Sequence, residues 1–325
     1  MKKIVVFDTA LGTSNNGDEI IMESIHNEFK ELIDNNFSLR LATHVNNFSF
    51  LQMCRNNGKI NYFKNADYKF IFGTNLIAQK RIGKVNSQWQ LKLSNIPIYE
   101  GCILVGAGCT FGGDKTDALA KMLYKKVLSK KYYHSVRDEQ TKKVVESLGV
   151  KAINTGCPTL WCFTPEFCNE IPETKAEECI ITVSGYADQF DTQMDQKMID
   201  IVKSNYKKVY CYIQTTEDEK YLNKLKNTED IVRVYSLNKY KEILNTKDID
   251  YVGTRLHGGI YAMQNKCRSI IISIDHRARG FYETNNIPIL ERNSMDKLDN
   301  MINSKFKTEI RINQKAIDSF KNQFK

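Results

Sequence analysis

Two side chains able to bind and protonate an anion lie in one short stretch, Gly-Thr-Arg-Leu-His-Gly-Gly-Ile-Tyr-Ala, late in the chain. The guanidinium of Arg255 can hold a carboxylate or phosphate through two parallel hydrogen bonds, and His257 can carry a proton near neutral pH. The pattern predicts a strand followed by a helix. Gly258 and Gly259 at that turn would let an anion approach helix N–H groups that have no partner. An ordinary strand-to-helix turn with an ion-paired Arg and a capping His fits the same residues.

The elements that must position these groups alternate along the chain. Apolar runs end in glycine or polar turns and are followed by amphipathic runs, which predicts parallel strands joined by helices. We expect strands at 3–7, 38–45, 68–75, 102–108, 132–138 and 152–154, then at 179–184, 208–213, 231–236, 249–253 and 269–274. We expect helices from 17 onward, at 48–55, 115–129 and 139–148, then at 191–205, 217–227, 239–245 and 257–265. This predicts an α/β protein of two doubly wound domains facing a cleft.

The length of 325 residues exceeds one ordinary hydrophobic core, so two domains are expected. Three of the five prolines fall in residues 156–178, which marks a linker. We therefore predict an N-terminal domain at 1–160, a linker at 161–178 and a C-terminal domain at 179–294. Residues 295–325 are predicted to form an amphipathic helical tail.

Composition narrows the class of protein and its partners. A hydrophobic content of 42% with 26% charged residues is typical of a globular protein. A strand begins almost at once, and no apolar run approaches the roughly 18 residues of a membrane span, so we expect a cytoplasmic protein. The net charge of +9 is spread without a clustered stripe, which argues against nucleic acid and suits a small anionic substrate or the anionic membrane face. The nine cysteines form no C-x-x-C pair, which predicts free thiols and no metal site.

A series of motifs, each following a predicted strand or turn, resembles the polysaccharide pyruvyl transferase family in content and order. The matching segments are Asn16-Gly17-Asp18-Glu19, Ala66-Asp67 leading to Gly73, Val105-Gly106-Ala107-Gly108, Ser135-Val136-Arg137-Asp138-Glu139 with Leu148-Gly149, Gly156-Cys157-Pro158-Thr159, Arg255-Leu256-His257, and Asp275-His276-Arg277-Ala278-Arg279-Gly280. The resemblance covers residues 3 to 290. It departs from the family at residues 73–75, which read Gly-Thr-Asn instead of a run of glycines, and near 276, where many relatives carry Lys.

The resemblance implies a GT-B-like fold of two Rossmann-like domains, with the acceptor bound by the N-terminal domain and the donor by the C-terminal one. It also implies transfer of a pyruvyl group from phosphoenolpyruvate to two hydroxyls of a sugar, forming a ketal on a polysaccharide, glycan or lipid-linked precursor. No cofactor or metal is implied, and a peripheral contact with the inner face of the membrane is in keeping with such substrates. The residues expected to bind substrate are Arg137, Arg255, Leu256, Gly258, Gly259, His276, Arg277, Arg279, Asn16, Gly17, Gly106 and Gly108.

The chemistry of such a reaction assigns roles to five of the residues. The donor carries a carboxylate and a phosphate, which need fixed cations such as arginine. Ketal formation begins with protonation of the enol carbon, for which His257 is the best candidate, and phosphate departure would be assisted by Arg279 together with Arg255. Asp18 or Glu19 would take the proton of the sugar hydroxyl, although electrostatics at a helix N-terminus explains these two acids equally well.

Two other classes of function fit the same sequence. A nucleotide-sugar glycosyltransferase of the same fold would need a carboxylate for the ribose, a role open to Glu283 or Glu291. A sugar- or phosphate-binding protein without catalytic activity could also be built from two α/β domains joined by a hinge. Binding alone, however, does not require a proton donor such as His257.

Overall fold

The computed structural model describes residues 1–55, 58–82, 88–110 and 115–325, apart from the side chains of residues 59, 276 and 277. The chain divides into two compact units. The first comprises residues 1–13, 21–161 and 313–325, and the second comprises residues 14–20 and 162–312. The division therefore falls inside the first helix, and residues 162–178 of the range predicted as a linker group with the second unit.

The first unit is built on a parallel sheet of order β2-β1-β3-β5. Its strands and helices are β1 (Lys3–Asp8), α1 (Gly17–Glu28), α2 (Lys30–Asp34), β2 (Phe37–Ala42), α3 (Phe50–Cys54), α4 (Gly58–Lys64), β3 (Tyr68–Phe72), β4 (Ile77–Ala78), α5 (Ile96–Tyr99), β5 (Ile103–Val105), β6 (Cys109–Thr110), α6 (Ala118–Val127), β7 (His134–Val136), α7 (Glu139–Glu146), β8 (Ala152–Asn154) and α15 (Gln314–Asn322). Short 3-10 turns span Leu93–Asn95 and Pro158–Leu160. Strand β7 pairs with β8.

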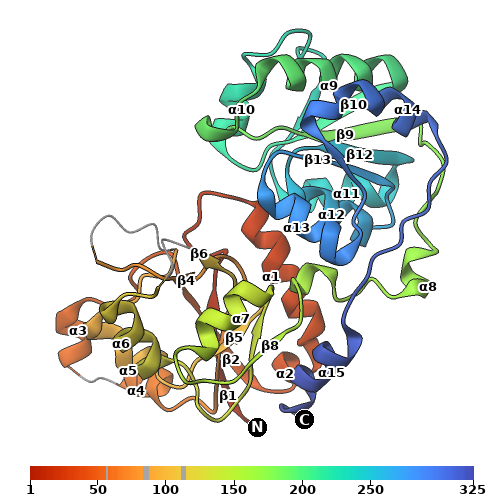
Figure 1. Cartoon of the computed structure of the whole chain (residues 1–325). Helices are drawn as coiled ribbons and strands as arrows, with labels where there is room; N and C mark the ends of the chain where they lie inside the picture. The colour runs from red at the N-terminus through yellow and green to blue at the C-terminus, as the bar shows by residue number, and fades with distance from the viewer. Residues whose placement is uncertain (56–57, 83–87, 111–114) are drawn as a thin grey trace. The chain divides into compact units, whose positions relative to one another are not determined.

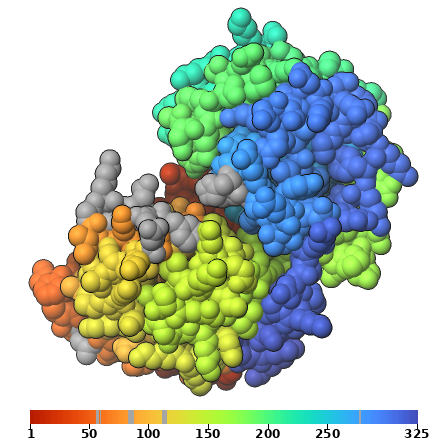
Figure 2. Space-filling model, viewed as in Figure 1, coloured from red at the N-terminus to blue at the C-terminus, as the bar shows by residue number. Residues whose placement is uncertain are grey.

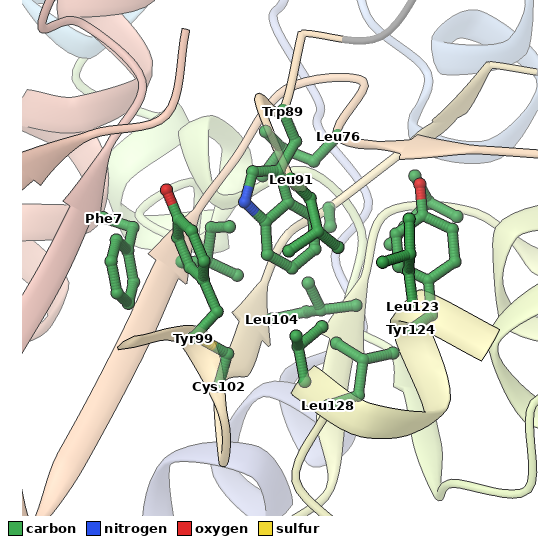
Figure 3. Close-up of a cluster of buried hydrophobic side chains, with 14 of the residues drawn as sticks. Phe7, Leu76, Trp89, Leu91, Tyr99, Cys102, Leu104, Leu123, Tyr124 and Leu128 are labelled. Atoms are coloured by element: carbon green, nitrogen blue, oxygen red, sulfur yellow. The ribbon is translucent and has the colours of Figure 1, made fainter. Parts of the chain in front are cut away.

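Alternating side chains of β1 supply the two hydrophobic faces of this sheet. One face packs against α3 to α7, where the ring of Tyr99 lies 4.4 Å from that of Phe7 and 5.3 Å from that of Trp89 (Figure 3). On the other face Phe29 packs against Phe320 and Phe324, the last aromatic residues of the chain. Helix α15 therefore completes the core of the first unit, beside α1 and α2 (Figure 1).

The second unit holds a six-stranded parallel sheet of order β11-β10-β9-β12-β13-β14. Its elements are α8 (Pro165–Cys168), β9 (Glu178–Thr182), α9 (Thr192–Asn205), β10 (Lys208–Tyr212), α10 (Thr216–Leu222), β11 (Val232–Val234), α11 (Leu237–Thr246), β12 (Ile249–Gly253), α12 (Leu256–Gln264), β13 (Ser269–Ser273), α13 (His276–Asn285), β14 (Ile289–Glu291) and α14 (Leu298–Asn303). Short 3-10 turns span Ala187–Gln189 and Arg292–Lys297. On the side drawn in Figure 2, green residues of α9 and blue residues of α13 and α14 cover this sheet.

The prediction of two Rossmann-like α/β units is confirmed, and several local predictions are corrected. The strands expected at 68–75 and 102–108 end earlier, because Gly73 and Gly106 adopt positive φ angles of 54° and 65° that break an extended chain. Helices α4 and α13 and the edge strand β14 were not predicted. The expected helical tail is two separate helices, with residues 304–313 between them lying outside regular structure. No helix in the described ranges has the length and apolar character needed to cross a membrane.

Candidate functional site

Arg255 lies at the point of the second sheet where the strand order reverses. Strand β9 has β10 on one side and β12 on the other, and ligands of open α/β sheets bind beyond the carboxyl ends of strands at such a point. Arg255 follows β12, and its backbone N–H donates to Thr182 Oγ1, at the end of β9, over 3.1 Å. The Tyr251 hydroxyl donates to the Arg255 carbonyl over 2.8 Å, which fixes the turn into α12.

The Arg255 side chain is a buried cation with one donor to spare. It is 8% exposed, forms an ion pair with Asp218, and lies 4.3 Å from the ring centroid of Tyr186. Burial lowers the pKa of Arg255, but Asp218 and Tyr186 more than offset this, so the net pKa is raised and the group stays charged. Among the described residues Nε has no hydrogen-bond partner. A buried donor without a partner is costly, so this site is suited to an anionic ligand.

Asp218 holds this arrangement together, and the sequence analysis did not single it out. Its carboxylate accepts the backbone N–H groups of Gly185, at 2.7 Å, and of Gln214 and Thr215, at 3.2 and 3.1 Å. Thr215 and Asp218 also form the capping box of α10. The Thr-x-x-Asp spacing was a visible signal for that cap, but nothing local in the sequence pairs it with Arg255.

His257 is the second residue of α12, and the two glycines follow it. His257 is half-buried, and its ring meets Phe281 edge-on with 6.5 Å between centroids. A Cβ on Gly259 would lie 2.5 Å from Ile271 Cγ1, and one on Gly258 would lie 3.1 Å from Gln214 Nε2. The glycines therefore let α12 pack closely against its sheet, a structural requirement separate from their predicted contact with a ligand.

The motif at the start of α1 belongs to the second unit. Asn16 donates its backbone N–H to the Gln214 carbonyl over 3.0 Å and its amide to the Tyr235 carbonyl over 2.8 Å. A Cβ on Gly17 would lie 2.8 Å from Gln214 Oε1, so the Gln214 amide is located between Gly17 and Gly258. The first turn of α1 and the first turn of α12 therefore share one side chain.

The two acids of this motif differ in exposure. Asp18 is buried and Glu19 is exposed. Burial, and next the charge of Glu19, raise the pKa of Tyr212, whose hydroxyl has no hydrogen-bond partner among the described residues. Glu19 therefore lies within electrostatic reach of the end of β10, in the unit that carries Arg255 and His257.

In the first unit the predicted group around Arg137 is compact. Arg137 donates to Asn75 Oδ1 over 2.5 Å, and its Nε lies 3.5 Å from Asp138 Oδ2. A Cβ on Gly108 would lie 2.5 Å from the guanidinium carbon, so only glycine leaves room for this side chain. Asn75, in the segment that departs from the family pattern, is a neighbour of Arg137 that the sequence analysis missed.

Gly106 has a structural role in the same unit. It has a positive φ, and a Cβ there would lie 2.1 Å from Pro158 Cγ. Its N–H donates to Ser135 Oγ over 2.9 Å, and Ser135 in turn bonds Thr155 at 2.6 Å. These contacts account for the glycine and the serine of two family motifs as parts of a buried turn.

The last motif is only partly described. The side chains of His276 and Arg277 lie outside the part of the chain that the structure describes. Arg279 is exposed and forms a two-pronged pair with Glu291, with Nη2 to Oε2 at 3.0 Å, and this carboxylate raises the pKa of Arg279. Within the described ranges no group of three His, Cys, Asp or Glu residues is placed to hold a metal, and the nine cysteines are free thiols.

Solved structures with a similar fold include UDP-GlcNAc 2-epimerases. The UDP-GlcNAc 2-epimerase of Methanocaldococcus jannaschii matches with a TM-score of 0.53 and 13% identity, over 99% of each chain. A putative UDP-N-acetylglucosamine 2-epimerase of Listeria monocytogenes matches at 0.52 and 11% identity, over 98% of this chain and 90% of that one. MnaA of S. aureus, solved with UDP, matches at 0.50 and 10% identity, over 99% and 97%. These likenesses identify the fold as GT-B.

The family within this fold comes from the sequence. The profile of the polysaccharide pyruvyl transferases matches residues 15–276, from the start of α1 to the start of α13. The chain belongs to the polysaccharide pyruvyl transferase family, which confirms the resemblance seen in its motifs, and it is a transferase of polysaccharide pyruvylation. Among curated proteins, none matches the sequence.

Proposed function

We propose that this transferase moves the pyruvyl group of phosphoenolpyruvate onto two hydroxyls of one sugar, forming a cyclic ketal. The observation that carries the proposal is the buried Arg255 at the reversal point of the second sheet, with an Nε donor that has no partner among the described residues. A small dianion or trianion such as phosphoenolpyruvate suits this cation, because Asp218 already fixes the guanidinium and little ordering remains to be done.

His257 is proposed as the acid that protonates the methylene carbon of the donor. It lies two residues after Arg255, in the first turn of α12, and is half-buried, and we propose that a ligand bound to the guanidinium reaches its ring. Protonation of the methylene makes the adjacent carbon, which carries the carboxylate and the phosphate, a cation-like centre, and one sugar hydroxyl attacks that carbon. The second hydroxyl then displaces phosphate, so that one donor and one diol yield one ketal and one phosphate.

The base that takes a hydroxyl proton is proposed to be Glu19 or Asp18. Both lie in the first turn of α1, in the same unit as Arg255 and His257. Leu256, Gly258 and Gly259 would shape the donor site, and Asn16 and Gly17 hold the α1 turn against Gln214. Phosphate release is proposed to use Arg255, together with Arg277 and Arg279 of α13.

Arg137 is proposed as a substrate-binding cation of the first unit. Its guanidinium is held by the side chain of Asn75 and lies against Gly108, where there is no Cβ. A binding site for a charged group needs such a preorganised cation. We further propose that the protein acts in the cytoplasm, on a glycan or lipid-diphosphate-linked precursor, with its positive net charge favouring contact with an anionic membrane face.

The rival glycosyltransferase function receives less support from the same unit. Of the two carboxylates that could bind ribose, Glu291 already accepts a two-pronged bond from Arg279, which leaves Glu283 for that role. We therefore place nucleotide-sugar chemistry second.

The decisive experiment measures phosphate release from phosphoenolpyruvate, with and without galactosides and acceptors that contain N-acetylmannosamine. The proposal expects release that depends on the acceptor, and a product whose mass corresponds to one added pyruvyl ketal. His257→Asn should lower kcat by about 10²- to 10⁴-fold, the usual contribution of a general acid. His26→Asn, on an exposed position of α1, is the matched control and should leave kcat unchanged.

Two results would reject the proposal. One is acceptor-dependent release that His257→Asn does not slow in a normally folded protein. The other is thermal stabilisation by a nucleotide sugar but not by phosphoenolpyruvate, which would assign the chain to the glycosyltransferases.

A further inference from the structure

A cavity in the second unit is not used by the donor chemistry described above. It has a volume of about 430 Å³, within the range of about 300–1,000 Å³ typical of small-molecule sites. Its lining includes Ser14, Asn16, Gln214, Glu219, Lys220 and Tyr235. All of them belong to the second unit, and we call this cavity the Tyr235 pocket.

The walls of the Tyr235 pocket are fixed by hydrogen bonds. Asn16 reaches both Gln214 and Tyr235, through its backbone N–H and its side-chain amide respectively. Glu219, another lining residue, accepts through Oε1 from Asn223 over 3.4 Å and lies 3.8 Å from Arg233 Nε. The pocket therefore has little freedom to collapse, which is a property of a prepared binding site.

Two polar atoms of these lining residues have no hydrogen-bond partner in the part of the chain that the structure describes. Gln214 is 4% exposed and its Nε2 donor lacks a partner, while the buried Oε2 of Glu219 lacks a donor. Each such group costs free energy unless a ligand or water satisfies it. One donor and one acceptor together match the hydroxyl groups of a carbohydrate, each of which both donates and accepts.

The remaining lining residues favour a neutral sugar over a charged or purely apolar ligand. Tyr235 is 59% exposed and offers an aromatic face to the C–H face of a pyranose ring. The lining carries one carboxylate, Glu219, and one ammonium, Lys220, so its charge is balanced. A diphosphate would need several cations, and an apolar ligand would leave Gln214 and Glu219 unsatisfied.

We propose that the Tyr235 pocket binds a neutral pyranose unit of the glycan acceptor, which places that sugar in the second unit and not in the N-terminal domain that the family resemblance implies. Assigning that sugar to the acceptor rests on the function proposed above. Gln214 links the pocket to the reaction, because its amide also lies between Gly17 and Gly258, the residue after His257. A sugar bound in the pocket would lie beside the start of α1, which carries the proposed base, and Gln214 links the pocket to the first turn of α12, which carries the proposed acid.

The test measures saccharide binding to the full chain by saturation-transfer NMR titration. The probes are methyl β-D-galactopyranoside and a methyl glycoside of N-acetylmannosamine, each with and without phosphoenolpyruvate. We expect wild-type protein to bind at least one probe, and Tyr235→Ala to weaken binding about tenfold, because the contact with the aromatic ring is lost. Tyr235→Phe should retain binding, and Glu219→Gln should weaken it.

Tyr282→Ala is the matched control, because Tyr282 is 50% exposed on α13 of the same unit and lies outside the pocket lining. Saccharide binding that is absent from wild type, or unchanged in Tyr235→Ala and Glu219→Gln, overturns the assignment. Binding of UDP that depends on Tyr235, without saccharide binding, also overturns it and assigns the pocket to a nucleotide.

The design separates this inference from the proposed reaction. If saccharide binding depends on Tyr235 but no acceptor stimulates phosphate release, the assignment of the pocket is supported and the proposed pyruvyl transfer is rejected. If phosphate release depends on the acceptor but Tyr235→Ala leaves the acceptor KM unchanged, the proposed reaction is supported and the assignment of the pocket is rejected.

Discussion

The ion pair of Asp218 and Arg255 allows a quantitative test of how the second unit prepares its cation. Asp218→Asn keeps the shape of the side chain but removes the charge opposite a guanidinium that is 8% exposed. Removing one partner of a buried pair costs about 3–5 kcal/mol, because the other charge is left without compensation. The introduced amide also places an NH₂ group among the N–H donors of Gly185, Gln214 and Thr215.

This free energy converts into a large change in melting temperature. For a unit of about 150 residues, 1 kcal/mol shifts Tm by about 2–4 °C, so the substitution should lower the Tm of the second unit by about 6–20 °C. Differential scanning calorimetry of the full chain, with and without phosphoenolpyruvate, measures that shift. Phosphoenolpyruvate should recover part of it, because a bound anion restores the missing negative charge.

The control is Asp296→Asn, which removes the partner of Lys197 in an exposed pair and should leave Tm nearly unchanged. In Arg255→Met the cation is absent, so adding Asp218→Asn should cost much less than it does in wild type. Equal Tm shifts from Asp218→Asn and Asp296→Asn would refute the argument that burial makes the Asp218 charge essential.

Burial lowers the pKa of His134 to about 4, and its Nδ1 already accepts the Leu104 N–H at 3.1 Å while its Nε2 donates to the Ser129 carbonyl. An unfolded histidine has a pKa of about 6.5, so the unfolded chain binds the proton first. The free energy of unfolding of the first unit should therefore fall by about 3 kcal/mol between pH 6.5 and pH 4. Urea titrations should show a smaller fall in His134→Asn. Gly259→Ala should cost about 1–3 kcal/mol by overpacking, measured as a lower Tm, whereas Gly280→Ala, with open space at its Cβ, should be neutral or stabilising. Equal effects of the two glycine substitutions would contradict the packing role of Gly259.

Most strands of the two main sheets could be predicted because they are continuous apolar runs. β1 and β3 are buried on both faces, and such runs keep their character whatever surrounds them. Strand β14 has three residues, Ile289 to Glu291, and only its neighbour β13 makes it a strand. Helix α13 contains a glycine and only three apolar residues, so its apolar pattern was too short to predict a helix.

The family motifs could be found in the sequence, but most of the contacts that hold them could not. Arg255 was selected for its chemistry, whereas Asp218 was not, because the two meet only when β10 and β12 come to lie on either side of β9. Strand order is set by the tertiary fold. A residue that fixes a site from a non-adjacent strand therefore leaves little local signal.

The motif from Asn16 to Glu19 belongs to the second unit although it follows a strand of the first. Its position in the sequence is therefore a weak guide to the unit in which it acts. The motif follows β1, so sequence reasoning placed it in the first domain. Its hydrogen bonds run instead to Gln214 and Tyr235, the residues after β10 and β11. Because the Gln214 amide also lies against Gly258, a substitution at Gln214 acts on the start of α1 and on the start of α12 together. Gln214→Ala should therefore raise both the donor KM and the acceptor KM. Tyr235→Ala should raise only the acceptor KM. Separate titrations of the two substrates distinguish these outcomes.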